Sequence, residues 1–343
     1  MPHKPQLDGL RFLAFLAVFF FHARPADNHL GREGVHVFFT LSGFLITRIL
    51  ILGESGDLGA DLRRFYIRRS LRIFPLYYAA VACLWAAGRL PGVGWYLGYV
   101  YNIRAYLDRD WGGPVGHFWT LSVEEQFYLL YPPILLLTPA RLRPWLIGAL
   151  LAASKAFQAY AHARLAVPWC IFLLPYCGEH LLWGCLAGLI ELRTGPGRRE
   201  GPIALLIGVP LLILARGRPG WVANPPGSAV ILAASSGFAV GSALVVFGLW
   251  RADRPWIART IGAGPVAYLG KISYGLYVYH LIVIEFLVRR GWAYRAVPEF
   301  LLIRDDYLAL LLTIAIAAAS WRFFEAPINR SKDRLTRRPA PGG

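Results

Sequence analysis

Residues 7–23 read LDGLRFLAFLAVFFFHA, an apolar segment in which ten apolar residues separate Arg11 from His22. An α-helix turns by about 100° per residue, so two side chains eleven positions apart lie on one face. They are about 16 Å apart along the helix axis. Ionisable residues inside an apolar segment of membrane length are costly and mark functional sites. The segment therefore predicts a transmembrane helix with a functional face.

The composition is that of a membrane protein. Of 343 residues, 56% are hydrophobic and 16% are charged, whereas about 25% are charged in soluble domains. The apolar runs are continuous rather than alternating, which excludes an outer-membrane barrel. We predict an all-α fold, a polytopic transmembrane helical bundle of about ten spans. The predicted spans are residues 8–23, 34–52, 73–89, 118–138, 144–164, 168–190, 202–216, 228–250, 264–288 and 306–326.

The positive charges indicate how the chain lies in the membrane. The net charge is +16, and Arg and Lys concentrate in the loops 53–72, 191–201 and 251–260 and in the tail. These segments face the cytoplasm if both termini are cytoplasmic, as the positive-inside rule requires. We therefore expect a multi-pass protein of the cytoplasmic (inner) membrane, in contact with lipid and not with nucleic acid. The aromatic stretch 91–107 is interpreted as an interfacial or re-entrant piece that does not cross.

The domain organisation is simple. We expect one transmembrane domain over residues 1–329 and a short, basic, disordered cytoplasmic tail over residues 330–343. No internal repeat and no separate soluble domain is visible. The four cysteines lie in apolar segments without zinc-binding spacing, so no metal site is expected. A secretory signal peptide is an alternative for the first segment, but the following spans favour a membrane helix.

His22 and Arg11 each allow two interpretations. Imidazole titrates near neutral pH, which suits His22 to general base catalysis, but it also suits a hydrogen-bonded histidine in a helix core. Arg11 is suited to grip a phosphate or carboxylate, or it orients the helix by reaching the interface. The sequence also places Arg69 and Arg72 on one helical face, either as a phosphate site or as a contact with anionic headgroups.

Three further segments carry polar residues. Ser42 and Gly43 lie in an apolar span and favour close helix packing; no nucleophile elbow surrounds the serine. Ser122 and Glu125 have the spacing of a capping box at a helix start, and Glu124 and Glu125 are expected on different faces, with one facing the interior.

Near the C-terminal end, Tyr274, Tyr277 and His280 follow at steps of three residues and line one face. They are interpreted either as a polar wall within the helical bundle or as an aromatic belt at the membrane interface together with a hydrogen-bonded histidine.

Together these segments resemble the membrane-bound acyltransferase 3 family in order and spacing, over almost the entire chain. The matching pieces are LDGLR followed by His22, GVHVFFTLSGFLI (34–46), RRSLRIFPLYY (68–78), FWTLSVEEQFYLLYP (118–132) and LGKISYGLYVYH (269–280). The resemblance implies an O-acyltransferase that moves an acyl group, commonly acetyl, from acyl-CoA to a hydroxyl. The implied acceptor is a carbohydrate or glycan, or alternatively an antibiotic or a lipid. Acyl-CoA is then a co-substrate, and no tightly bound cofactor is expected.

The resemblance also implies roles for single residues. Arg11 and His22 match an Arg-x10-His motif in which the histidine is catalytic, and Arg69 and Arg72 match an Arg-x-x-Arg motif associated with the CoA donor. Arg11 is assigned to the same donor site. Glu124 matches an acidic position and is assigned a catalytic role. Substrate binding is assigned to the residues Trp119, Tyr274 and His280.

The chain departs from the family in two positions and in length. His36 stands where members often carry Asp, and Phe12 replaces a frequent Gly. Some relatives carry a fused SGNH esterase-like domain, for which this chain is too short, so none is expected. A transporter or flippase that uses intramembrane Arg, His and Glu is the alternative function; the absence of paired broken helices and of an inverted repeat argues against it. Transfer of the acyl group through His22 itself, as an acyl-enzyme, is the alternative to direct transfer.

Overall fold

The structure is a computed structural model that describes residues 3–24, 30–110, 112–165, 167–194, 199–216, 227–252, 255–291 and 299–335. These residues form helices joined by turns and loops, without a strand among them. In chain order the helices are α1 (Pro5–Ala23), α2 (Gly31–Gly53), α3 (Leu58–Ala86), α4 (Gly94–Leu97), α5 (Tyr101–Asp108), α6 (Phe118–Leu137), α7 (Arg143–Arg164), α8 (Val167–Cys170), α9 (Leu174–Arg193), α10 (Glu200–Ala215), α11 (Ser228–Arg251), α12 (Pro255–Arg259), α13 (Gly264–Lys271), α14 (Ser273–Arg289), α15 (Glu299–Ser320), the π-helix η2 (Trp321–Glu325) and α16 (Ala326–Leu335).

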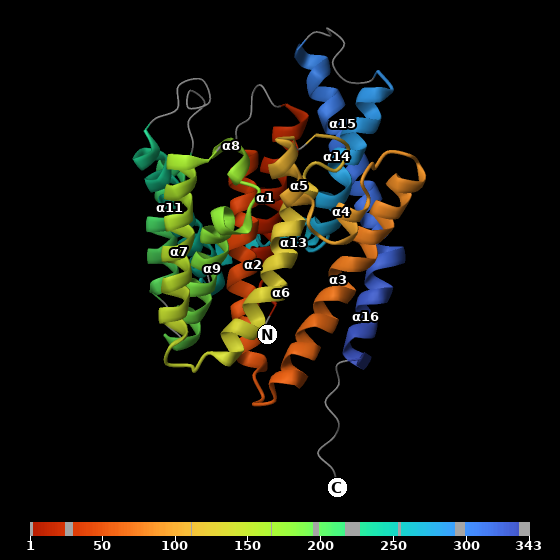
Figure 1. The fold of residues 1–343 in the computed structure, drawn as a ribbon. Coiled ribbons are helices and arrows are strands. Elements are labelled where there is room, and N and C mark those ends of the chain that lie inside the picture. Colours follow the sequence, from red (N-terminus) through yellow and green to blue (C-terminus); the bar gives the residue numbers. More distant parts are fainter. Residues whose placement is uncertain are drawn as a thin grey trace.

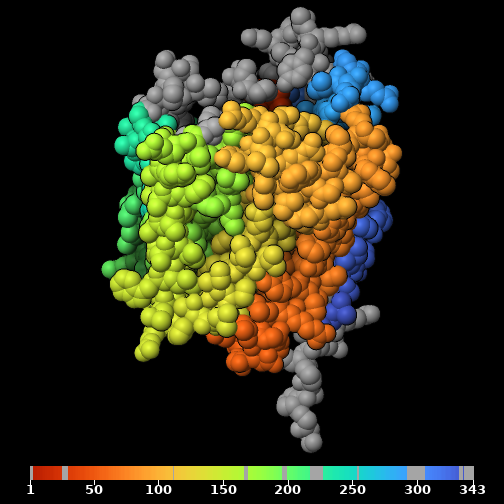
Figure 2. All heavy atoms as spheres, in the orientation of Figure 1, coloured from red at the N-terminus to blue at the C-terminus, as the bar shows by residue number. Residues whose placement is uncertain are grey.

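The long helices run side by side as a bundle. Figure 1 shows α7, α9 and α11 on one side, α3, α14, α15 and α16 on the other, and α1, α2 and α6 between them. In Figure 2 the segment that contains α4 and α5 covers the face of the molecule above α3 and α6. The functional segments of the sequence, which lie on α1, α2, α3, α6 and α14, therefore meet in the middle of the bundle.

Each of the ten predicted spans falls on one helix or on consecutive helices, up to three for residues 306–326. Within the described ranges, four uninterrupted helical segments are long and apolar enough to cross a membrane. They are Pro5–Ala23, Gly31–Gly53, Ser228–Arg251 and Asp306–Ser331. The pair α13 and α14 adds a fifth if the two helices form one broken span. The helical membrane fold is thus supported, whereas the count of ten crossings and the side of the termini stay predictions.

Two helix boundaries differ from the sequence prediction. The arginine-rich segment 53–72, predicted as a loop, is mostly helical, because the Asp57 side chain caps α3 by accepting a hydrogen bond from the Ala60 amide at 3.0 Å. The capping box is also wrong, since α6 begins at Phe118. Ser122 lies within that helix and donates to the Phe118 carbonyl at 3.2 Å.

The predicted span 264–288 is not one straight helix, because α13 and α14 are bent by 71°. The bend allows α13 to pack against α1 at Gly270, where a Cβ atom would overlap the carbonyl oxygen of Asp8. Residues 91–107 form the short helices α4 and α5 rather than a span, joined through Tyr99 at a φ of 52°. At the C-terminal end, α16 makes residues 330–335 of the predicted disordered tail helical, and residues 336–343 lie outside the described part of the chain.

Glycines set the distance between the central helices. A Cβ atom on Gly43 of α2 would overlap the Leu181 carbonyl oxygen of α9, and one on Gly184 of α9 would overlap the Thr40 carbonyl of α2. Gly188 follows Gly184 by four residues and meets α2 in the same way, at the Phe44 carbonyl oxygen. This is the small-residue packing by which membrane helices approach closely, and it confirms the packing role expected for Gly43.

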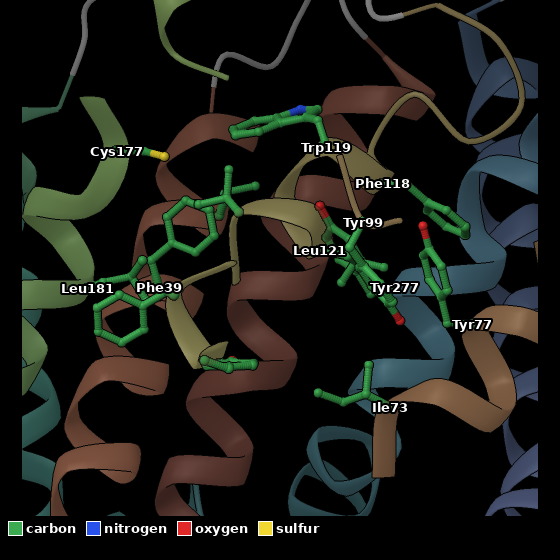
Figure 3. Packing of buried hydrophobic residues seen from close by; sticks show 14 of the residues in the cluster. Phe39, Ile73, Tyr77, Tyr99, Phe118, Trp119, Leu121, Cys177, Leu181 and Tyr277 are labelled. Carbon is green, nitrogen blue, oxygen red and sulfur yellow. The ribbon is translucent and has the colours of Figure 1, made fainter. Parts of the chain in front are cut away.

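Aromatic side chains fill the core between α3, α6 and α14 (Figure 3). Tyr77 stacks on Tyr99 with ring centroids 4.1 Å apart and lies 5.0 Å from the Phe118 ring. The Tyr77 hydroxyl donates to the Tyr96 carbonyl at 2.9 Å, so a buried polar atom is satisfied. This core holds the start of α6 against α3 and thereby fixes the residues around Trp119.

We expect Gly184→Ala to destabilise the protein, because its new methyl group has no room between α9 and α2. Overpacking of this kind costs about 1–3 kcal/mol. Thermal unfolding of the purified protein in detergent measures the effect. Gly148→Ala on α7 is the matched control, because a Cβ there has no neighbour within 4 Å. Equal melting temperatures for the two variants would contradict the packing argument.

Candidate active site

The central helices enclose two adjoining cavities. The first, here the arginine cavity, has a volume of about 170 Å³ and lies between α1, α2, α3, α6 and α14. Its polar lining includes Arg11, Arg69, Arg72, Glu124, Glu125, Tyr128 and Tyr274. The second, here the histidine cavity, has a volume of about 340 Å³. Its lining includes His22, His36, His117, Trp119, His180 and Phe238.

Three guanidinium groups face the arginine cavity. Arg69 and Arg72 are one helical turn apart on α3, and Arg11 joins them from α1, where it forms an ion pair with Asp8. The Arg69 guanidinium lies 3.9 Å from the centre of the Tyr128 ring, and its buried Nε has no hydrogen-bond partner among the described residues. Arg72 forms no ion pair or hydrogen bond with another described residue. Such a cluster is suited to bind a polyanion such as a phosphorylated ligand.

Glu124 lies at the end of a hydrogen-bonded chain in the same cavity. The Tyr128 hydroxyl donates to Ser42 Oγ at 3.0 Å, and Ser42 Oγ donates to Glu124 Oε1 at 2.6 Å. Glu125 lines the cavity too, so the prediction that only one of the two carboxylates faces the interior is wrong. The cavity reaches around α6 toward both α2 and α3, and it therefore meets two faces of that helix.

His22 is held by two contacts in the histidine cavity. Its Nδ1 lies 3.0 Å from the Val18 carbonyl oxygen and 3.2 Å from His280 Nε2. His280 Nδ1 lies 2.6 Å from the Tyr277 carbonyl oxygen. A carbonyl only accepts, so both Nδ1 atoms carry the proton when the rings are neutral. His22 Nε2 is then left with a lone pair, as a general base requires.

His117 completes a group of three histidines from three helices. Its ring centroid lies 4.6 Å from that of His280 and 6.4 Å from that of His22. Both of its ring nitrogens are buried without a hydrogen-bond partner in the described part of the chain. No three His, Cys, Asp or Glu residues among those described are arranged to hold a metal ion.

Thr120 and Tyr277 separate the cavities and line both of them, as does Val35. Their hydroxyl oxygens lie 2.7 Å apart. Both hydroxyls also reach the His117 carbonyl oxygen, Thr120 Oγ1 at 2.9 Å and the Tyr277 hydroxyl at 3.4 Å. The two cavities are therefore neighbours whose dividing wall is one side-chain hydrogen bond and Val35.

The structure divides the residues predicted from sequence between the two cavities. Those in the arginine cavity are Arg11, Arg69, Arg72, Glu124 and Tyr274. His22 and Trp119 line the histidine cavity, and His280 contacts His22 without lining either one. Glu124, assigned a catalytic role with His22, lines only the arginine cavity.

Sequence reasoning missed His117, His180 and Tyr128. The only signal for His117 was its position directly before the FWTLSVEEQ block. His180 stands in an apolar segment, where nothing in the sequence indicates which face meets a cavity, whereas Tyr128 follows Glu124 by four residues and so lies on the same helical face.

Comparisons with known proteins agree with the resemblance seen in the sequence. A family model of the acyltransferase 3 type, described as an acyltransferase domain, matches residues 4–322. A protein of Staphylococcus aureus (strain MSSA476) with the name "Putative O-acetyltransferase SAS0844" is 25% identical, over 96% of this chain and 58% of its own length. O-acetyltransferase OatA of Staphylococcus aureus (strain NCTC 8325 / PS 47) is 25% identical, over 96% of this chain and 57% of its own length. The chain thus spans less than three fifths of these relatives. No solved structure matches.

Inorganic pyrophosphate is expected to bind the arginine cavity and to raise the melting temperature of the purified protein. At ten times the Kd the stabilisation is about 1.4 kcal/mol. Arg72→Ala should weaken binding about tenfold or more, because a charge-assisted contact is lost. Arg68→Ala is the control, since Arg68 is absent from the lining of this cavity. An equal response of both variants to pyrophosphate would show that the cavity is not the binding site.

Proposed function

The chain belongs to the acyltransferase 3 family, and from this premise we propose that it is an integral-membrane O-acyltransferase. It moves an acyl group, acetyl in the first instance, from acyl-CoA to a hydroxyl of a carbohydrate or glycan. One observation carries this proposal: the cavity with three arginines adjoins the cavity that contains His22. The Nδ1 atom of His22 is held by contacts with a carbonyl oxygen and with the His280 imidazole. The names of the relatives, O-acetyltransferase in each case, support acetyl as the group transferred.

The donor binds with its phosphates in the arginine cavity. Coenzyme A carries several phosphate charges, and guanidinium groups bind phosphate by charge-assisted hydrogen bonds. Arg69 and Arg72 share one face of α3, and neither forms an ion pair with a described residue. With the N-terminus in the cytoplasm, this cavity lies toward the side on which acyl-CoA is available.

The pantetheine arm then extends from the arginine cavity into the histidine cavity. Arg11 and His22 are about 16 Å apart along α1, which suits an extended arm rather than a compact ligand. The arm passes Val35, Thr120 and Tyr277, the three residues that line both cavities. The thioester reaches His22 when the hydrogen bond between the two hydroxyls opens or makes room for it.

His22 Nε2 removes the proton of the acceptor hydroxyl as the hydroxyl oxygen attacks the thioester carbonyl. The new C–O ester bond forms, the C–S bond breaks, and the CoA thiolate receives the proton from His22. His280 acts through His22 as a positioning residue, because its Nε2 accepts from His22 Nδ1 and fixes the ring. Glu124 acts on the donor side, where its carboxylate lies among the arginines.

We expect His22→Ala to lower the rate of acetyl transfer by about 10²–10⁴-fold, the usual contribution of a general base. Acetyl-CoA should still raise the melting temperature of this variant, because the arginine cavity is intact. The measurement is transfer of labelled acetyl by protein in lipid nanodiscs to acceptor in envelope preparations. His162→Ala, on α7 and outside both cavities, should transfer at a rate within twofold of wild type. Wild-type transfer by well-folded His22→Ala would refute the proposed base.

A further inference from the structure

A second pair of histidines lies in the histidine cavity, apart from His22. His36 of α2 and His180 of α9 stack with ring centroids 3.7 Å apart and an angle of 15° between their planes. His180 is 1% exposed, and its Nδ1 has no hydrogen-bond partner among the described residues. No described side chain forms a hydrogen bond with the ring of His36 either. A buried polar atom without a partner is costly unless a ligand satisfies it.

The close packing of α2 and α9 creates this pair. On α2, His36 precedes Gly43 by two helical turns. On α9, His180 precedes Gly184 by one turn. Each histidine therefore lies on the same helical face as the glycine that follows it. These glycines bring the two backbones into contact. The imidazole rings of both helices are therefore pressed together where the cavity opens between them.

The charged groups near the pair are already satisfied by one another. Glu179 accepts from Lys155 Nζ at 2.9 Å, from Ser236 Oγ at 2.7 Å and from Gln158 Nε2 at 3.1 Å. The Lys155 ammonium is thus neutralised away from the cavity, whose lining does not include it. Arg32 does line the cavity, but it is half exposed and lies 3.9 Å from the Glu33 carboxylate.

We propose that His36 and His180 bind the acceptor through a hydroxyl other than the one that is acylated. This inference rests on the proposed acyl transfer and adds the class of acceptor, a neutral polyhydroxylated unit such as an uncharged sugar. A neutral imidazole has one donor and one acceptor, which matches a hydroxyl group. Apolar walls that include Phe238 and Trp119 fit the C–H face of a sugar ring.

An acidic sugar fits this site less well. A carboxylate placed against the stacked rings would find no unpaired cation, because Lys155 is held by Glu179 and Arg32, the cation in the cavity lining, already faces the Glu33 carboxylate. Burying such an unpaired charge is costly. The His36–His180 pair therefore selects for a neutral acceptor unit, and it is the part of the cavity that distinguishes hydroxylated acceptors from one another.

The test uses envelopes from a strain in which the gene is deleted, because these retain the acceptor in its unacylated form. Purified wild type, His36→Ala, His180→Ala and the control His162→Ala are each supplied with labelled acetyl-CoA. We expect transfer to fall about tenfold or more in the first two variants, as for the loss of one or two buried hydrogen bonds. The control should stay within twofold of wild type. Thermal stabilisation by acetyl-CoA should be the same in all four proteins.

Each result has a defined meaning. Wild-type transfer by both His36→Ala and His180→Ala overturns the inference, as does a labelled ester on a sugar unit that carries a carboxylate or phosphate. Loss of acetyl-CoA stabilisation in these variants also overturns it, because the pair would then be structural. If wild type neither transfers acetyl nor responds to acetyl-CoA, the proposed function itself fails, independently of the histidine pair.

Discussion

Contact between helix backbones at glycines is the constraint on which the rest of this structure depends. In a membrane, apolar side chains gain little from leaving lipid, so helices associate by close packing. Here α9 meets α2 at Gly184 and α13 meets α1 at Gly270, each time against a carbonyl oxygen. The second contact accompanies the 71° bend after which α14 brings His280 to His22. The arrangement of the site thus depends on glycines at the positions where two helix backbones touch.

The two cavities differ in the kind of polar group they contain. Charges gather in the arginine cavity, where three guanidinium groups face two carboxylates and Arg11 is paired in addition with Asp8. The histidine cavity contains mainly imidazoles, which are able to exchange protons without a permanent charge. Burying a cation that has no ion-pair partner among the described residues, as Arg72 has none, is costly, and under the proposed function the phosphates of the donor offset this cost. Under the same proposal, separation keeps those strong charges away from His22, which as a base must stay neutral in order to accept a proton.

Hydropathy predicts the helical character and the positions of the apolar helices because it depends on composition, which is read directly from the sequence. The family resemblance also implies that Arg11, Arg69 and Arg72 serve one donor site, and all three line one cavity. The wrong predictions concern which face of a helix meets a cavity and where a helix is interrupted. That Glu125 meets a cavity depends on α3 as a neighbour, and the break at Ile272 depends on the packing of α13 against α1. Neither neighbour is visible in a single linear segment.

The wall between the cavities is thin for a reason that follows from the proposed chemistry. A thioester that reacts with a hydroxyl also reacts with water, so an open channel between the two sides would waste the donor. A wall of fixed backbone would exclude water but would also exclude the pantetheine arm. A hydrogen bond between Thr120 and Tyr277 meets both demands, since a net cost of about 1 kcal/mol opens it. Under the proposed function the pantetheine arm itself then fills the gap, so that the passage is open only while the donor occupies it.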